Sequence, residues 1–384
     1  MKRILGTFAV ACVLVASPAM AADAVREEAG TMPDGSVVEA VVLSNANGVS
    51  ARVLTYGATL QSLTAPDRDG NPADITLGYD DVTKYQTHPN YFGVTVGRYA
   101  NRIADGAFSL DGRRYQLIQN DKTNSLHGGA LGFDKRMWRI VSVESGPVAR
   151  LVLALTSEDG DQGYPGKLEV TVTYTLDDGG DLGIVFEATS DRATIVNMTN
   201  HALFNLAGHD STVDAMQHWL MIPASRYTPV DERLIPTGEL ASVAGTVFDF
   251  REPRVVEDGL RDGTNEQIVL GRGYDHNWVI DKGRTASPEL VARLADPASG
   301  RVLDVLSTEP GVQFYTGNFL DGTVSGKGGK VYRMGDGIAL EPQLFPDTPN
   351  QPDFGSARVD PEHPYRHEMV YRVHTMAEDA PARP

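Results

Sequence analysis

Apolar and polar residues alternate in short runs along most of this chain, and such runs predict β-strands. The clearest run, residues 168–176, has an apolar side chain at every second position, with Glu and Thr between them. Successive side chains of a strand point to opposite faces of its sheet, so this pattern predicts one buried and one exposed face. Asp and Gly at 177–180 predict a turn into a second run at 182–188. Shorter runs of the same character lie at 37–43, 51–56, 151–156 and 369–374.

The connections between these runs favour antiparallel pairing. Residues 108–115 are typical of a β-hairpin, because Asp111-Gly112 suits a tight two-residue turn. Helical periodicity is scarce and predicts only short helices, at 80–85 and 253–260. Regular turn signals with few helices indicate an all-β fold, either a sandwich or a barrel of antiparallel strands.

Length and the first residues bound the domain organisation. A chain of 384 residues would ordinarily form two domains. No linker, repeat or break in composition divides it, so we expect a single β domain over 22–384.

Residues 1–21 are typical of a secretory signal, in which Lys2 and Arg3 precede an apolar stretch and Ala19-Met20-Ala21 suits cleavage. We therefore expect a periplasmic or secreted protein.

Two alternatives exist for this N-terminal segment. A transmembrane anchor would need a longer apolar run than this one, which ends at Pro18. Lipidation of Cys12 would need a better cleavage motif than Ala9-Val10-Ala11. We favour the cleaved signal, and expect no membrane association after its removal.

Charge and cysteine content narrow the function further. The formal net charge is −17, which disfavours binding to nucleic acid or to an anionic membrane. Cys12 is the only cysteine, so the mature chain would hold no disulfide, thiolate nucleophile or cysteine-bound zinc. His363 and His367 are four residues apart, but Pro364 between them disfavours a helical metal site. No metal and no cofactor is expected.

Glu341 is the first candidate for chemistry. It follows a short apolar run and precedes Pro342, which favours extended backbone at the residue before it. Proline recurs three times before residue 353 and disfavours both a helix and a central strand there. Glu341 is therefore predicted to be the last residue of a strand, where a carboxylate could act as a base. A solvated strand-end Glu is the commoner explanation for such an acid considered alone.

The segment 197–208 supplies a second candidate, His201. In an extended run His201 shares a face with Leu203 and Asn205, whereas Ala202, Phe204 and Leu206 share the other and should be core. His201 would then face a cleft or solvent. A lone histidine is more often structural than catalytic, so this segment by itself favours the structural role.

Several polar residues could bind a ligand rich in oxygen atoms. Asn101 and Arg102 lie between apolar neighbours, where their donor groups are costly without a partner. His127 precedes paired glycines, which allow close approach of the backbone or simply form a turn. Asp275 could accept hydrogen bonds from hydroxyl groups or merely begin a strand, and Gln313 lies among aromatic residues.

Taken together, these segments resemble the aldose 1-epimerase family, the galactose mutarotases. The resemblance is collinear from about Ala40 to the C-terminus. It implies a large antiparallel β-supersandwich with the sugar in an open cleft. The matching motifs are GRYANRI, NSLHGGALGFD, GYPG (163–166), TNHALFNLAG, YDHN, PGVQFYTGNFL and ALEPQLFPDTPN.

The resemblance also implies roles for individual residues. Glu341 matches the family's catalytic base and His201 its acid. The sugar-binding positions match Asn101, Arg102, His127, Asp275 and Gln313. The sequence departs from the family where Ala202-Leu203 replaces a common Ser-Tyr and Pro342 replaces a common Thr, which leaves the substrate preference open.

The activity implied is interconversion of the α and β anomers of a free aldohexose or aldopentose, such as galactose or glucose, by a monomer or weak dimer. An anionic Glu341 would help to keep His201 protonated. A non-catalytic sugar-binding protein is one alternative, but it would not require both residues. A glycosidase would need two facing carboxylates, and a hexose-phosphate epimerase would need a cluster of arginines.

Overall fold

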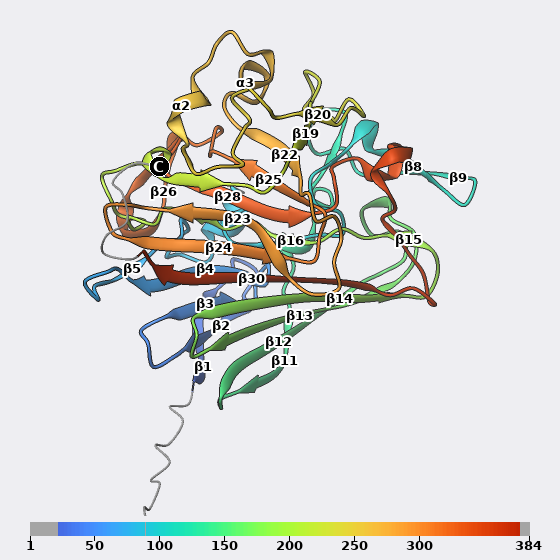
Figure 1. Ribbon diagram of the computed structural model, residues 1–384. Helices are drawn as coiled ribbons and strands as arrows, with labels where there is room; N and C mark the ends of the chain where they lie inside the picture. The colour runs from blue at the N-terminus through green and yellow to red at the C-terminus, as the bar shows by residue number, and fades with distance from the viewer. Residues whose placement is uncertain (1–21, 89, 377–384) are drawn as a thin grey trace, which may run out of the picture.

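The computed structural model describes residues 22–88 and 90–376. Three antiparallel sheets contain most of the strands and stack across the molecule (Figure 1). The largest has nine strands, in the order β11-β12-β13-β14-β30-β24-β23-β18-β21. Their bounds are β11 Arg139–Glu144, β12 Val148–Ser157, β13 Leu168–Asp177, β14 Asp181–Ser190, β30 Tyr365–Thr375, β24 Arg301–Ser307, β23 Glu289–Ala295, β18 Trp219–Met221 and β21 Arg254–Val255.

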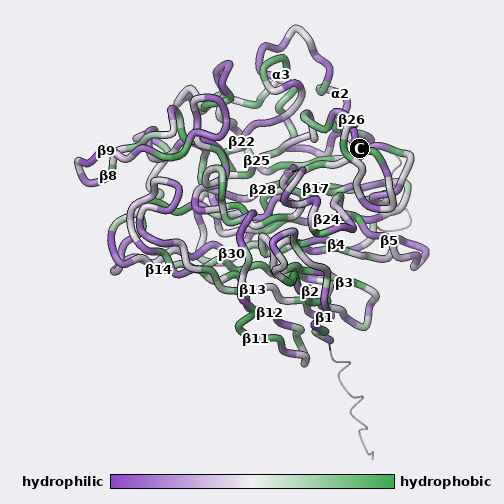
Figure 2. Tube along the Cα trace, turned by 180° about the vertical axis from the view of Figure 1, so that it is seen from behind, coloured by the Kyte–Doolittle hydropathy of each residue, from purple (hydrophilic) through white to green (hydrophobic). Residues whose placement is uncertain are grey.

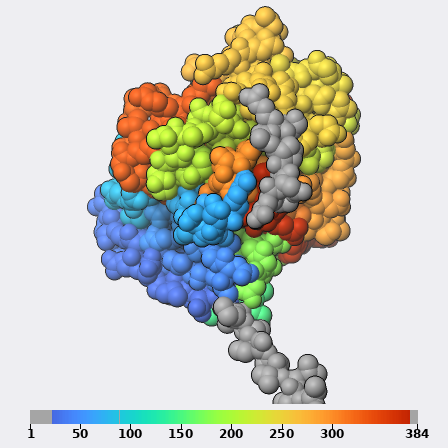
Figure 3. Space-filling model, turned by 60° about the vertical axis from the view of Figure 1, so that its left-hand side comes forward, coloured from blue at the N-terminus to red at the C-terminus, as the bar shows by residue number. Residues whose placement is uncertain are grey.

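Two smaller sheets complete this framework. The five-stranded sheet is an N-terminal meander of β1 Asp23–Thr31, β2 Val37–Ser44, β3 Ser50–Leu54, β4 Thr59–Pro66 and β5 Pro72–Asp74. The six-stranded sheet has the order β17-β28-β25-β22-β19-β20. Its strands are β17 Leu203–Phe204, β28 Ile338–Gln343, β25 Gly311–Tyr315, β22 Asp275–Val279, β19 Arg226–Thr228 and β20 Ala241–Ser242. In the space-filling view the N-terminal strands, in blue, and the middle of the chain, in yellow, lie at opposite ends of the face shown (Figure 3).

The predicted all-β class is confirmed, and the alternating runs are its strands. In β13 the apolar residues Leu168, Val170, Val172, Tyr174 and Leu176 are at most 1% exposed, and they belong to the main hydrophobic core. Hydrophobic segments, in green, follow the central strands of the stacked sheets (Figure 2). The alternation in sequence identified the core residues correctly, because one face of each central strand packs against another sheet.

The predicted hairpin is also present. Strands β8 (Ala107–Leu110) and β9 (Arg113–Gln116) pair in register around Asp111 and Gly112. These two residues have φ of 50° and 76°, the left-handed pair that a tight turn between twisted strands requires.

The expectations about helices need correction. The helix expected at 80–85 is displaced to α1 (Lys84–Thr87), the one at 253–260 is reduced to α2 (Glu257–Leu260), and α3 (Glu266–Gly271) was not predicted. These helices are four to six residues long, too short for the 3.6-residue pattern to repeat and so to be recognised in the sequence. Within the residues described, no helix is both long and apolar enough to cross a membrane.

The segment 91–103 begins with aromatic and β-branched residues typical of a strand, but its backbone is largely irregular. Only β6 (Thr95–Val96) and β7 (Arg102–Ile103) are strands there. Tyr91 and Asn101 have φ of 58° and 63°, which interrupts extended backbone.

Strand β28 runs two residues beyond Glu341 instead of ending there. Pro342 and Gln343 pair with Val312 and Gly311 of β25. On its other side β28 pairs with β17 only at Ile338 and Ala339, so at Pro342 no β17 residue needs an N–H donor. The next, proline-rich segment forms two 3₁₀ turns, Thr348–Asn350 and Pro352–Phe354.

Candidate active site

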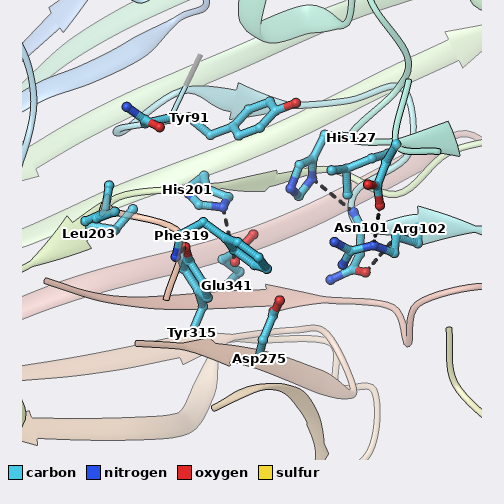
Figure 4. Close-up of a pocket in the computed structure, with 14 residues that line it drawn as sticks. Tyr91, Asn101, Arg102, His127, His201, Leu203, Asp275, Tyr315, Phe319 and Glu341 are labelled. Carbon is cyan, nitrogen blue, oxygen red and sulfur yellow. Dashed lines mark hydrogen bonds and ion pairs between the residues drawn. The ribbon is translucent and has the colours of Figure 1, made fainter. Parts of the chain in front are cut away.

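One pocket gathers most of the residues that the sequence singled out. It encloses about 250 Å³, below the roughly 300–1,000 Å³ of sites for drug-sized ligands, and so suits a small molecule. Figure 4 shows the labelled side chains arranged around a common space. The lining includes the predicted residues Asn101, Arg102, His127, His201, Asp275 and Glu341, together with Asn90, Tyr91, Asp121, Leu126, Leu203, Tyr315, Phe319 and Leu320.

The six-stranded sheet places the two carboxylates. On the central strand β25, Gln313 lies opposite Glu341 of β28 and opposite Asn277 of β22. Asp275 is two residues before Asn277 on β22, so it shares that residue's face. Glu341 and Asp275 are only 2% and 8% exposed. The register thus brings two buried acids from different strands into one pocket.

Gln313 is the one predicted site residue that does not line the pocket. Its side-chain nitrogen donates a hydrogen bond to Oδ1 of Asp275 at 2.8 Å. Gln313 is therefore placed to orient Asp275, which does line the pocket.

His201 reaches the pocket from the short connection between β16 (Thr199–Asn200) and β17. Its backbone N–H donates to the carbonyl of Val94 at 3.0 Å, and its carbonyl accepts from the N–H of Gly93 at 2.9 Å. Nε2 of His201 lies 3.6 Å from Oε1 of Glu341, the contact drawn dashed in Figure 4. Ala202, Phe204 and Leu206 lie in the main core as predicted, whereas Leu203 lines the pocket.

Asn101, Arg102 and His127 line another part of the pocket, where the ring of His127 lies 5.3 Å from that of His201, between centroids. Strand β7 pairs with β10 (Ser125–Leu126), which brings His127 beside Asn101. The N–H of Asn101 donates to Nδ1 of His127 at 3.2 Å, so the other ring nitrogen of a neutral His127 carries the proton. Nε of Arg102 pairs with Oδ2 of Asp121 at 2.8 Å. Sequence reasoning missed Asp121, since nothing in its local pattern marks it as a partner of Arg102.

Arg98, which lies in the same segment as Asn101 and Arg102, has a structural role. It is 2% exposed, and one guanidinium nitrogen donates to the carbonyls of Pro165 and Gly166, both at 2.9 Å. Another donates to the hydroxyl of Ser157 at 2.6 Å. These contacts pair the two terminal guanidinium nitrogens of the buried cation with groups of the protein itself.

Aromatic rings form the remaining walls of the pocket. The ring of Tyr91 lies 4.7 Å from that of His127 and 5.7 Å from that of His201, between centroids. Tyr315 and Phe319 stack with centroids 6.2 Å apart, and Phe319 is 47% exposed. Such faces suit the C–H face of a sugar ring. The aromatic-rich pattern around residues 315–319 was a usable signal for Tyr315 and Phe319.

Burial changes the protonation of the central pair. It lowers the pKa of His201 from 6.5 to about 4. It raises the pKa of Glu341 well above the ordinary carboxyl value, and Asp275 adds to this effect while Arg102 opposes it. Burial thus favours the neutral form of both groups, whereas the sequence led us to expect a protonated His201 beside an anionic Glu341.

No group of three or more His, Cys, Asp or Glu side chains is placed to hold a metal ion in residues 22–88 and 90–376. The chemistry that this pocket offers is acid–base chemistry on a small polyhydroxylated ligand, with amides, an arginine and aromatic faces to hold it. An antiparallel β fold with such a pocket defines a class of sugar-binding proteins.

Comparison with known proteins specifies the family. A model of the family described as aldose 1-epimerase matches residues 39–372. Galactose mutarotase from Mus musculus is 43% identical over 343 residues, which cover 89% of this chain and 96% of that protein. Aldose 1-epimerase from Escherichia coli (strain K12) is 39% identical over 329 residues, covering 86% and 92% respectively. The chain belongs to the aldose 1-epimerase family and is an isomerase of the mutarotase type.

Solved structures agree with this placement. The galactose 1-epimerase from Lactobacillus acidophilus NCFM superimposes with a TM-score of 0.80 at 29% identity, covering 93% of this chain and all of that one (100%). An aldose epimerase homologue from C. elegans superimposes with a TM-score of 0.78 at 32% identity, covering 86% and 97%. The predicted mutarotase-like fold is thereby confirmed.

Proposed function

We propose that the pocket interconverts the α and β anomers of a free aldose, with Glu341 as the base and His201 as the acid. The observation that carries this proposal is the 3.6 Å separation of Nε2 of His201 and Oε1 of Glu341 inside one small pocket. The anomeric hydroxyl and the ring oxygen of a pyranose are bonded to the same carbon. A base and an acid must therefore lie close together to act on both.

The reaction needs one proton to leave and one to arrive. Glu341 takes the proton from the anomeric O1 hydroxyl while the C1–O5 bond breaks, and His201 supplies a proton to O5. The open aldehyde rotates about C1–C2, and the ring closes on the other face of C1 with the two roles reversed. Arg102, Asn101 and Asp275 hold the hydroxyl groups during these steps.

Galactose is the first substrate to test, because the mammalian relatives carry the name galactose mutarotase. The side chain of Leu203 lines the pocket but can neither donate nor accept a hydrogen bond. It therefore does not select among sugars by bonding a hydroxyl group. Glucose, xylose and arabinose anomers complete the panel, compared by proton NMR.

Polarimetry on a freshly dissolved pure anomer tests the two roles. We expect Glu341→Gln and His201→Ala each to reduce kcat by about 10²–10⁴-fold, the usual contribution of a general acid or base. Glu362→Gln and His363→Asn are matched controls, since both residues are exposed. Catalytic variants that equilibrate the anomer at the wild-type rate would refute the roles, as would controls that lose activity equally.

Export of the protein is a separate part of this proposal. The predicted signal, residues 1–21, lies outside the described residues, and its support is the sequence pattern alone. Expression of the full chain in a Gram-negative host should give a periplasmic product that begins at Ala22 by mass spectrometry. A cytoplasmic product that retains Met1 would contradict it.

A single domain over 22–384 and a monomeric or weakly dimeric state complete the proposal. The family match spans 39–372 without interruption, which favours one unit. Sedimentation velocity at several concentrations would measure the oligomeric state, and one cooperative unfolding transition would support a single domain.

A further inference from the structure

Three buried amides share a face of the six-stranded sheet with the proposed base, and two of them, Asn277 and Gln343, have no part in the proposed reaction. The amide cluster consists of Asn277, Gln313 and Gln343, which are 0%, 3% and 0% exposed. Within the described residues, both polar side-chain atoms of Asn277 and of Gln343 lack a hydrogen-bond partner, as does Oε1 of Gln313. Buried amides are costly when unpaired, so such a concentration requires an explanation.

Strand register places the amide cluster on the pocket face of the sheet. Gln343 follows Glu341 by two residues on β28, so both side chains project from the same face. Asn277 and Glu341 flank Gln313 of β25 from the two neighbouring strands. Both pairings run without a shift in register.

Gly311 allows these amides to converge. It lies opposite Gln343 on one side and Val279 on the other. A Cβ atom at Gly311 would lie 2.4 Å from Oδ1 of Asn277 and 2.8 Å from the ring of Phe345. The amide of Asn277 therefore extends over β25 toward β28, and the missing side chain of Gly311 provides the space.

The two carboxylate oxygens of Glu341 have different surroundings. Oε1 lies near His201 in the pocket, whereas Oε2 is buried and lacks a hydrogen-bond partner among the described residues. Within the residues described, Oε2 is thus an unpaired carboxylate oxygen of a residue that shares its sheet face with the amide cluster. Carboxylate oxygens are acceptors, and amide nitrogens are donors.

We propose that Asn277 and Gln343 are positioning residues that hold Oε2 of Glu341 through ordered water. Water is the ligand that fits, because it can both donate to a carboxylate and bond to the oxygen and nitrogen atoms of several amides. The water would keep Oε1 directed at the sugar and solvate the ionised carboxylate from behind. This inference rests on the proposed role of Glu341 as the base.

Other ionisable groups act on the same carboxylate. His201 faces it from the connection between β16 and β17. Asp275 on β22 and Arg102 on β7 influence it through their charges. Tyr315 on β25 and Tyr371 on β30 are close enough for Glu341 to influence them. The amide cluster differs from all of these because it carries no charge and does not titrate.

The test is the pH profile of kcat/KM for Gln343→Met and Asn277→Leu, with Asn205→Leu as the control. An acid–base pair should give a bell-shaped profile whose alkaline limb reports Glu341. Without the amides that hold the solvating water, the ionised carboxylate is disfavoured, so this limb should move to higher pH, by on the order of one unit. KM should change less than kcat, because the two residues do not line the pocket. Asn205 is a buried amide that bonds the carbonyls of Val213 and Asp336 instead, so its replacement should cost stability without moving either limb.

A crystal structure of the wild-type protein at about 1.2 Å resolution provides the second measurement, which does not depend on folding of the variants. Ordered water bonded to Oε2 of Glu341 and to Asn277 or Gln343 is expected. Amides that bond one another with no water at Oε2, or limbs that stay in place in both variants, would overturn this inference while leaving the catalytic pair intact. A wild-type protein without mutarotase activity would instead overturn the proposed function.

Discussion

At the scale of the residue, the main feature of the site is that burial reverses the usual order of two pKa values. His201 has its pKa lowered to about 4, and Glu341 has its pKa raised. When the pair shares a single proton, that proton therefore resides mainly on the carboxyl group. The productive form, with the proton on His201, is the minor one, and the pair titrates as a unit.

We expect kcat/KM to follow a bell-shaped pH profile. At low pH both groups carry a proton and no base remains, and at high pH neither carries one and no acid remains. Because the pKa values are reversed, the acidic limb should lie near 4 and report His201, whereas the alkaline limb should report Glu341. Initial rates measured by polarimetry from pH 3.5 to 9 would check this, and a profile that only rises with pH would show that neutral His201 suffices as the acid.

Asp275 should shift one of these limbs. Its negative charge raises the pKa of Glu341, so Asp275→Asn should move the alkaline limb to lower pH by on the order of one unit. KM should rise as well, because the variant weakens the proposed contact of Asp275 to the sugar. The same kinetic series measures both, and an alkaline limb that moves upward would contradict the assignment.

At the scale of the element, the loop before β6 positions His201 by close packing of backbone. Gly93 has φ of +67°, and a Cβ atom there would lie 1.9 Å from the carbonyl oxygen of Leu60. Its N–H donates to the carbonyl of His201, and its own carbonyl accepts from the N–H of Leu60. A side chain at this position cannot be accommodated unless Gly93 or Leu60 moves, and Gly93 is hydrogen-bonded directly to His201.

Gly93→Ala should therefore destabilise the protein by at least about 2 kcal/mol, from strain at positive φ together with a backbone clash. Gly48→Ala is the matched control, since Gly48 has φ of +82° but no atom within 4 Å of the added Cβ. Gly48→Ala should lower the free energy of unfolding by only about 1 kcal/mol, the cost of holding a non-glycine residue at positive φ. Urea denaturation of the three proteins measures the difference, and equal losses in both variants would contradict the role of the close contact.

At the scale of the whole molecule, one buried acid should make stability depend on pH. Glu309 is fully buried (0% exposed), and burial raises its pKa from 4.5 to about 7, although Arg284 opposes the shift. The folded state therefore binds this proton more tightly than the unfolded state. The free energy of unfolding must fall as pH rises from 4.5 to 7 on account of this group.

Glu309→Gln removes that dependence. Relative to wild type, its free energy of unfolding should increase by on the order of 3 kcal/mol between pH 4.5 and pH 8, at about 1.4 kcal/mol per pKa unit. Urea denaturation of both proteins at several pH values gives the difference, and Glu362→Gln, at an exposed position, should show none. A difference that stays constant with pH would mean that Glu309 has the same pKa in the folded and unfolded states, and would contradict the shift.

Across these scales, the sequence predicted best the features that depend on local alternation. The strands around 168–176 and 182–188 and the turn at Asp111-Gly112 were foreseen, because a two-residue period and a left-handed dipeptide are local properties. The end of β28 was placed too early, since the effect of Pro342 depends on whether a neighbouring strand is present. Asp121 was missed for a related reason, because its partner Arg102 is 19 residues away.

The sequence by itself determined the all-β class, the family and the set of acids, amides and histidines available for chemistry. Only the tertiary structure decided that His201 and Glu341 lie 3.6 Å apart and that Gln313 donates a hydrogen bond to Asp275. It also decided that burial lowers the pKa of His201 and raises that of Glu341. The physical reason is that composition fixes which groups can donate or accept a proton. Their distances and their loss of solvent arise from strands that meet only after the chain has folded.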